Sequence, residues 1–299
     1  MHIISSEHID FDKWDACVQN NENGLIYATS TYLNAMTDNW SGLLINDYQA
    51  IMPLPWRKKW GIRYLYTPAF TQQLGLIGQT NVSATELQKK VLQFARFGNY
   101  LFNDGNAPLG DELSFFECNN YVIYLNKSYE EIRSSYKKNF KKNTNKPIHN
   151  ELYYQKSDEY ELAIRSFYQY NSAHILHVHS AEIDCFIKLC SQLFPANILV
   201  RKVTNKADEL LSIVLLLKDN KRYYNLINYT SAAGRKVEAN YFLYDNLFKE
   251  LAENDLLFDF EGSDLPGVKS FYECMGGLNK RYYLWQFNHL PWPLCLFKK

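Results

Sequence analysis

The sequence predicts an α/β protein of two lobes, each built on a mixed β-sheet with helices packed against it. A length of 299 residues suits two ordinary domains. An apolar content of 46% is enough for real cores, which excludes a disordered chain. The second half reads helix–helix–strand–strand–strand–helix–strand–helix–strand, an order that fits a mixed sheet flanked by helices better than a doubly wound fold or a sandwich. The first half is interpreted as a looser version of this order.

The N-terminal lobe is expected over residues 1–127. A helix is predicted near 11–18, followed by strands at 42–45, 50–56 and 62–66, where Pro68 ends the extended run. A second helix is predicted over 84–97, because Leu87, Val91 and Phe94 share one helical face and Gly98 follows. Short strands at 113–118 and 121–125 complete the lobe.

A basic helix over residues 128–146 is expected to open the C-terminal lobe. Ser128 is positioned to cap it with Glu131 as the capping-box partner, and Pro147 ends it. Its lysines form one stripe at helical spacing: Lys137, Lys138, Lys141, Lys142 and Lys146. Such a stripe is more often a solvated helix face, but it can also track the phosphates of a ligand.

The C-terminal lobe is expected over residues 128–299. Further helices are predicted at 158–172 and 182–192, and strands at 196–204, 210–218 and 222–229. In the helix predicted over 238–253, an inner apolar face recurs at Tyr244, Leu247, Phe248 and Leu251. A buried strand at 256–260, a short helix at 267–275 and an aromatic strand at 281–287 follow.

Charge and composition exclude several classes of protein. The 32 basic residues balance 32 acidic ones, which argues against binding nucleic acid by bulk charge. No apolar run approaches the roughly 20 residues of a membrane-spanning helix. The first residues do not form a signal peptide, and the six cysteines show no CxxC pair. We therefore expect a cytoplasmic protein with reduced thiols.

Several short segments of the sequence resemble one protein family. They are Arg235–Tyr244 (RKVEANYFLY), 258–263 (FDFEGS), 267–272 (GVKSFY) and Gly276-Gly277 in the second half, with 51–56 (IMPLPW), 67–75 (TPAFTQQLG) and 136–143 (YKKNFKKN) elsewhere. Together they are similar to the tandem GNAT domains of the Fem-type transferases and their acetyltransferase relatives. The resemblance covers nearly the whole chain, and it implies two GNAT-like domains.

The resemblance also implies an activity. Fem-type enzymes add amino acids from aminoacyl-tRNA to a peptidoglycan precursor, and relatives use acetyl-CoA. By analogy, this chain would transfer an acetyl or aminoacyl group directly to a small-molecule or peptide amine in its C-terminal lobe, with no tightly bound cofactor. The alternative is a binding module that keeps the scaffold without catalysis, since one fold serves many activities.

In a GNAT lobe the donor carbonyl lies where the two central parallel strands part, here 222–229 and 256–260. The loop after the first strand supplies candidate donor-binding residues: Thr230, Ser231, Gly234, Arg235 and Lys236. Small residues before a helix N-terminus suit a pyrophosphate. However, the Gln/Arg-x-x-Gly-x-Gly/Ala signature of CoA-binding relatives is not matched, because Glu238 stands at the first glycine. An ordinary solvated loop is the alternative.

Candidate catalytic residues follow the buried strand 256–260. Glu261 and Ser263 lie at its carboxyl end, where α/β sites commonly form, and a carboxylate there can orient or deprotonate an amine. Both residues could instead stabilise a turn. Tyr272 matches, by position, the tyrosine that reprotonates the leaving group in many GNAT enzymes.

A histidine cluster, His174, His177 and His179, is the one pattern that suggests a metal. No nearby cysteine or carboxylate pair completes a tetrahedral ligand set, so we predict no metal site. A GxSxG motif is also absent, which disfavours a covalent serine mechanism.

Overall fold

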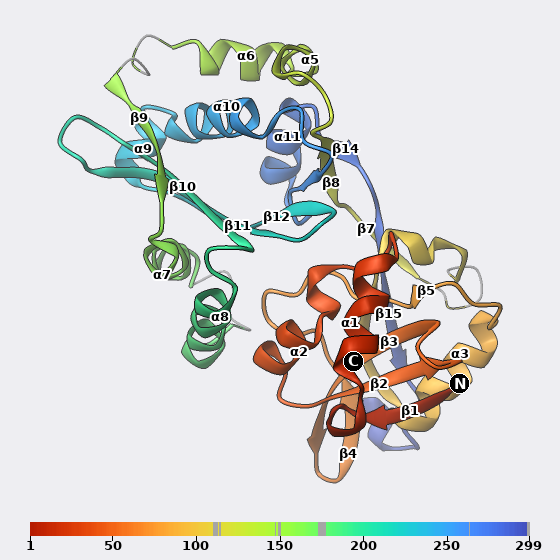
Figure 1. The fold of residues 1–299 in the computed structure, drawn as a ribbon. Helices are drawn as coiled ribbons and strands as arrows, with labels where there is room; N and C mark the ends of the chain where they lie inside the picture. The colour runs from red at the N-terminus through yellow and green to blue at the C-terminus, as the bar shows by residue number, and fades with distance from the viewer. Residues whose placement is uncertain are drawn as a thin grey trace. The chain divides into compact units, whose positions relative to one another are not determined.

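The computed structural model describes residues 1–109, 113, 115–146, 148, 151–172, 178–262 and 264–297 (Figure 1). The chain divides into two units, one made of two separate segments and the other of one continuous segment. The N-terminal unit contains residues Met1–Cys118 and Arg281–Lys299, and the C-terminal unit contains Asn119–Lys280.

The N-terminal unit contains an eight-stranded sheet. Its strands are β1 (His2–Ser5), β2 (Trp40–Ile45), β3 (Ala50–Lys59), β4 (Ile62–Leu65), β5 (Ile77–Gly78), β6 (Phe97–Phe102), β7 (Phe116–Cys118) and β15 (Tyr282–Asn288). Its helices are α1 (Phe11–Asn20), α2 (Ser30–Met36) and α3 (Ala84–Phe94), with short 3-10 turns η1 (Ser6–His8), η2 (Ile26–Ala28), η3 (Asp104–Leu109) and η5 (Leu294–Phe297). Helix α3 begins with the capping box of Ser83 and Glu86, which satisfies the first backbone N–H groups.

The C-terminal unit contains a seven-stranded sheet. Its strands are β8 (Tyr121–Tyr124), β9 (Tyr153–Ser157), β10 (Ile198–Thr204), β11 (Leu210–Lys218), β12 (Arg222–Thr230), β13 (Leu257–Asp259) and β14 (Leu278–Asn279). Its helices are α5 (Tyr129–Ser134), α6 (Lys138–Thr144), α7 (Tyr160–Asn171), α8 (Ser180–Leu193), α9 (Ala232–Lys236), α10 (Ala239–Leu251) and α11 (Pro266–Cys274). In Figure 1, α10 and α6 lie on one side of this sheet and α7 on the other.

The two sheets repeat one topology. The strand order is β1-β2-β3-β4-β6-β15-β7 in the first and β9-β10-β11-β12-β13-β8-β14 in the second. In both, the fourth and fifth strands are parallel and all other neighbours along this path are antiparallel. The interpretation of the first half as a looser copy of the second is therefore confirmed at the level of strand pairing.

The sixth position of each sheet is filled by the strand that follows the other half of the chain. Strand β8 follows β7 in sequence but pairs with β13 and β14, and β15 follows β14 but pairs with β6 and β7. The units consequently part at residues 118/119 and 280/281, which differs from the expected boundary at 127/128. The physical reason is that strand pairing, which local sequence does not reveal, assigns β8 and β15.

The single basic helix expected over 128–146 is two helices, α5 and α6. The break follows Ser134 and Ser135, whose hydroxyls donate to the carbonyls of Glu131 and Ile132 at 2.7 and 2.6 Å and compete with helix continuation. The Lys137 N–H donates instead to the Cys274 carbonyl at 2.9 Å, so a tertiary contact replaces a helical one.

The core of the C-terminal unit is aromatic, and α10 supplies much of it. Tyr244, Leu247, Phe248 and Leu251 are buried at i, i+3, i+4 and i+7, as the sequence pattern predicts. Phe258 of β13 packs edge-on against Phe248, with ring centroids 5.1 Å apart. Among the residues described, no helix is long and apolar enough to span a bilayer.

Candidate functional site

The parallel strands β12 and β13 part within the C-terminal sheet. Only three residue pairs join them, the last being Tyr224 with Asp259. Beyond that point β12 continues for six residues, and a shift in its pairing with β11 makes Leu226 an extra, bulged residue. The predicted parting of these strands is confirmed, and a cavity of about 720 Å³ opens beside their diverging ends.

The cavity is walled by aromatic rings and carries a few polar groups. Helices α7, α10 and α11 contribute Phe167, Tyr170, Tyr241, Tyr244, Phe271 and Tyr272, and β12 contributes Asn225, Leu226, Asn228 and Thr230. Arg235, Glu238 and Glu261 are its charged lining residues. A cavity of this size with a small number of placed polar groups is typical of a small-molecule site.

Glu261 is held at the mouth of β13 by a buried ion pair. Arg222 donates to the Asp259 carboxylate at 2.9 Å, and both side chains are at most 4% exposed. The other Asp259 oxygen accepts the Glu261 N–H at 2.9 Å. Glu261 itself adopts a left-handed conformation with φ 64°, which costs a non-glycine residue about 1–2 kcal/mol. A strained carboxylate at a strand end is a recurrent mark of a functional site.

Tyr272 lies where the sequence places it, in α11 beside the end of β13. Its ring stacks on Phe260, with centroids 4.4 Å apart and an interplanar angle of 24°. Burial raises the pKa of its phenol well above the usual value, and the negative charges of Glu261 and Asp259 raise it further. The hydroxyl therefore stays protonated at neutral pH and can donate a hydrogen bond.

A hydrogen-bond network that the sequence does not predict joins two asparagines of β12 to α10. Asn225 and Asn228 donate to the Tyr244 hydroxyl at 2.7 and 3.1 Å, and Asn228 also donates to Asn240 at 3.1 Å. Asn225 is 5% exposed, and its Oδ1 has no hydrogen-bond partner among the described residues. A buried acceptor without a partner is rare in a folded protein, and Asn225 is one of the residues that line the cavity. The available signal was two asparagines in a strand, where this residue type is depleted.

The predicted donor loop is only partly at the cavity. Thr230 and Arg235 line it, whereas Ser231, Gly234 and Lys236 are not among the lining residues. Ser231 caps α9 by accepting the Gly234 N–H at 3.0 Å. A Cβ on Gly234 would lie 2.0 Å from the Leu211 carbonyl oxygen, so this glycine is explained by close packing on β11. Residues 232–236 form the short helix α9 where an open loop is expected.

Glu238 takes the left-handed conformation of a glycine, with φ 55°, at the N-terminus of α10. Its carboxylate contacts the Lys146 ammonium at 2.6 Å. The negative charge that Glu238 brings to the first-glycine position of the CoA signature is thus offset by a lysine that follows α6. Arg235 donates to the Thr230 carbonyl at 2.6 Å and covers the Tyr170 ring at 4.5 Å.

The lysines in α6 and just before it fall into two groups. Lys137 pairs with Glu273 at 3.2 Å, and Lys141 donates to the Ser134 carbonyl at 3.0 Å. Lys138 and Lys142 are exposed one helical turn apart. Phe140, on the inner face of α6, contacts Tyr241 and Phe271 of the cavity wall, so α6 supports the cavity from outside.

Ser263, His174 and His177 lie outside the described residues. His179 precedes α8, and its backbone N–H donates to Glu182 at 3.0 Å. Among the described residues, no group of three or more histidine, cysteine or acidic side chains is arranged to hold a metal ion.

The N-terminal unit has a parallel strand pair at the equivalent place in its sheet, β4 and β6. The space beside this pair is occupied by a segment of the N-terminal unit itself. Strands β4 and β6 share one pair, Leu65 with Gly98, after which β6 pairs with Leu74. The Asn106 side chain accepts the Leu76 N–H at 3.0 Å and donates to the Leu76 carbonyl at 2.9 Å. The Asn103 side chain donates to the Leu74 carbonyl at 2.7 Å. The open wedge of the C-terminal sheet is thus filled here by residues 74–76.

Comparisons with known proteins find similarity in structure. No family model matches the chain, and no curated protein matches it in sequence. Structure comparison finds FemX, with a TM-score of 0.68, 12% identity, and coverage of 99% of both chains. A tandem GNAT protein from the clavulanic acid biosynthesis pathway has a TM-score of 0.55 at 7% identity, covering 97% of this chain and 99% of that one. L-PGS from Bacillus licheniformis has a TM-score of 0.53 at 11% identity, covering 96% and 94%.

At these identities the comparison concerns the fold. The superpositions on FemX and on the tandem GNAT protein cover 97% or more of this chain, so they take in both mixed sheets. The chain therefore has the tandem-GNAT fold and resembles the Fem-type proteins in structure across nearly its whole length.

Proposed function

We propose that the protein is an acyltransferase that moves an acetyl or aminoacyl group to an amine in the cavity of the C-terminal unit. The observation that carries this proposal is the early parting of β12 and β13, which opens the cavity between a strained carboxylate and a protonated tyrosine. FemX and a tandem GNAT protein from the clavulanic acid biosynthesis pathway share the fold, which supports the proposal.

The proposed reaction is direct. The acceptor amine attacks the donor carbonyl, forming a tetrahedral oxyanion that collapses to the new amide and releases the donor's oxygen or sulfur. Asn225 Oδ1 or Glu261 would accept an amine N–H and orient its lone pair, and Glu261 would take the proton lost on attack. Tyr272 would donate its hydroxyl hydrogen bond to the leaving atom.

The leaving group is the finer part of the proposal. Proton transfer is favourable when donor and acceptor pKa values match, and Tyr272 has a raised pKa from burial and its acidic neighbours. The leaving atom is a ribose oxygen where the donor is an aminoacyl-tRNA and the sulfur of CoA where the donor is acetyl-CoA. The exposed Lys138 and Lys142 are candidates for contacts to tRNA phosphates, with Lys137 and Lys141 beside them.

A non-catalytic binding module is the second candidate. The occupied Gly234 N–H and the glutamate at the glycine position of the CoA signature favour it over an acetyl-CoA enzyme. In that case the cavity would bind a ligand through Asn225 and its aromatic walls without turnover.

Thermal unfolding with acetyl-CoA, longer acyl-CoA and aminoacyl-tRNA tests donor binding first. A donor at about 100 times its dissociation constant should stabilise the protein by about 2.7 kcal/mol. Transfer is then measured with the stabilising donor and a panel of amines, following the N-acyl product by mass spectrometry. Glu253 is the matched control, because it is an exposed glutamate with the same left-handed conformation (φ 60°) as Glu261.

Glu261→Gln and Tyr272→Phe should each lower the transfer rate by about 10²–10⁴-fold while Glu253→Gln leaves it unchanged. Stabilisation by a donor without any product, in all variants alike, would support the binding module. No stabilisation by any donor would contradict the acyltransferase.

A further inference from the structure

The two most exposed large apolar side chains among the described residues are tryptophans of the N-terminal unit. Trp60 is 83% exposed and Trp292 is 80% exposed. Trp60 occupies the two-residue turn between β3 and β4 with φ 52°, followed by Gly61 with φ 79°. Such a turn favours Asn-Gly, and a bulky aromatic residue there is unfavourable. Turn formation therefore does not explain Trp60.

Strand register places both tryptophans at one end of the sheet. Leu65 of β4 and Asn288 of β15 lie beside the first residues of β6, Gly98 and Phe97. The turn at Trp60 extends beyond this line, since Ile62 lies about 10 Å farther along β4 than Leu65. The segment holding Trp292 stays at the same end, because Asn288 donates to the Cys295 carbonyl at 3.0 Å.

Three of the chain segments at this end lack acidic residues, and Asp38, which precedes β2, is paired with Arg57. Residues 57–65, 87–99 and 285–299 contain no aspartate or glutamate, although the whole chain has no net charge. Lys58 and Lys59 are exposed beside Trp60, with the Lys59 ammonium 5.1 Å from the indole centroid. Arg57 is bound to Asp38 at 2.5 Å, and Arg63 covers the Trp56 ring at 4.5 Å.

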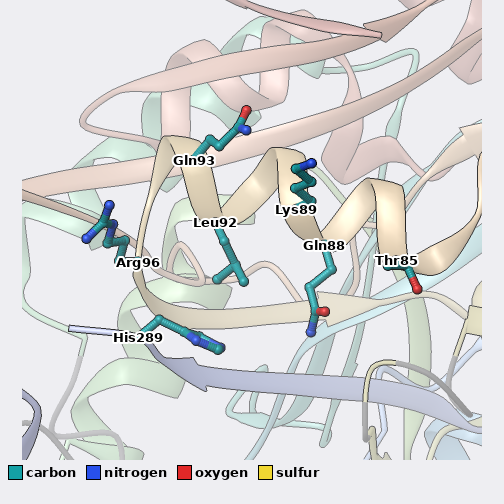
Figure 2. Close-up of a pocket in the computed structure, with 7 residues that line it drawn as sticks. All are labelled: Thr85, Gln88, Lys89, Leu92, Gln93, Arg96 and His289. Atoms are coloured by element: carbon teal, nitrogen blue, oxygen red, sulfur yellow. The ribbon is translucent and has the colours of Figure 1, made fainter. Parts of the chain in front are cut away.

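A hollow of about 430 Å³ lies on the surface at the same end (Figure 2). It runs along one face of α3 to His289, which follows β15 and whose backbone N–H donates to the Arg96 carbonyl at 2.7 Å. Its basic side chains are Lys89, Arg96 and His289, and its other lining residues are neutral. Such a lining suits an anionic headgroup.

We propose that this end of the N-terminal unit, which we name the basic edge (residues 58–61, 89, 96 and 289–296), docks on an anionic lipid surface. Trp60 and Trp292 insert at the level of the headgroups, where indole rings are favoured. The lysines and arginine attract the negative surface potential. The hollow receives a lipid phosphate.

Aliphatic exposure favours lipid over nucleic acid as the partner. Leu294 is 39% exposed and Leu296 is 65% exposed beside Trp292. Nucleic-acid bases stack on aromatic rings, whereas exposed leucines gain little from a phosphate backbone and much from burial among acyl chains. The proposal concerns attachment to one leaflet and needs no spanning helix.

Vesicle binding by the full chain tests the proposal. The probes are vesicles of phosphatidylcholine alone and of phosphatidylcholine with phosphatidylserine, and single-stranded RNA serves as the competing partner. Binding is followed by co-sedimentation and by quenching of tryptophan fluorescence with brominated lipid. Trp60→Asn removes the indole while favouring the turn, so its folding is secure. Trp292→Ser and Lys58→Glu/Lys59→Glu complete the set.

The wild-type protein should bind the anionic vesicles, with quenching, and not the neutral ones. Each tryptophan variant should weaken binding about tenfold or more, and the lysine pair should weaken it by about fivefold or more for each residue reversed. Lys188→Glu/Lys206→Glu is the control, because it changes the net charge equally at exposed positions of the C-terminal unit. Equal binding by wild type and edge variants, no binding to anionic vesicles, or binding of the edge to RNA alone would each overturn the proposal.

Discussion

The buried ion pair of Arg222 and Asp259 allows a sharp test of how the candidate site is held. Asp259→Asn keeps an oxygen that can accept the Glu261 N–H but removes the negative charge beside the guanidinium. Because both side chains are at most 4% exposed, water cannot replace the carboxylate. Breaking one partner of such a pair costs about 3–5 kcal/mol, since it leaves an uncompensated buried charge.

For a unit of this size, each kcal/mol corresponds to about 2–4 °C in Tm, so Asp259→Asn should lower the Tm by about 6–20 °C. Urea unfolding followed by circular dichroism gives the free energy directly. Adding Arg222→Met removes the stranded cation, and the double variant should recover most of the loss, because replacing both members of a buried pair is often near neutral.

An exposed pair supplies the control. Arg165 and Glu161 are each more than half exposed, so Glu161→Gln should change stability by less than about 1 kcal/mol. The reasoning is refuted if Asp259→Asn lies within about 1 kcal/mol of wild type. It is equally refuted if Arg222→Met/Asp259→Asn is less stable than Asp259→Asn alone.

Three further outcomes are expected. Gly234→Ala should destabilise the C-terminal unit by about 1–3 kcal/mol, because the new Cβ would lie 2.0 Å from a backbone oxygen of β11, and equal stability in urea would contradict this. Tyr100→Phe should cost about 1–3 kcal/mol, since the buried hydroxyl accepts the Gly75 N–H at 3.1 Å and donates to the Pro53 carbonyl at 2.8 Å; the matched change at the exposed Tyr153 should cost nothing measurable in the same assay. Burial opposes ionisation of Glu250, but hydrogen bonds from Arg201 and Tyr154 outweigh it and hold its pKa below the ordinary value. Its stabilising contribution is therefore present above the unfolded pKa of about 4.3 and lost as the pH falls through the lower folded value. Wild type and Glu250→Gln should therefore converge in stability as the pH falls below about 4.

Helical periodicity and local signals carried much of the fold. The buried face of α10 follows from the spacing of Tyr244, Leu247 and Phe248, and the capping box predicted at Ser128 is confirmed in α5. These signals act over three to seven residues, so they are readable in a linear string. The prediction of one continuous basic helix was wrong, because a hydrogen bond to Cys274, far along the chain, interrupts the helix at Lys137.

The candidate site was half predictable. Glu261 and Tyr272 follow a recognisable buried strand, and both line the cavity. The pairing of Glu238 with Lys146 and the packing of Gly234 on β11 join residues that are distant in sequence. No local pattern records such contacts.

The sequence by itself determined the fold class, because apolar spacing is set by the period of a helix or a strand. The sequence also determined that Glu261 lies shortly after the buried strand β13. Only the tertiary structure decided that β8 pairs within the C-terminal sheet and β15 within the N-terminal sheet, and that β12 leaves β13 after Tyr224. The reason is that strand neighbours are chosen by long-range packing and hydrogen bonding across the sheet, where residues far apart in the chain become adjacent. The cavity exists because of that choice.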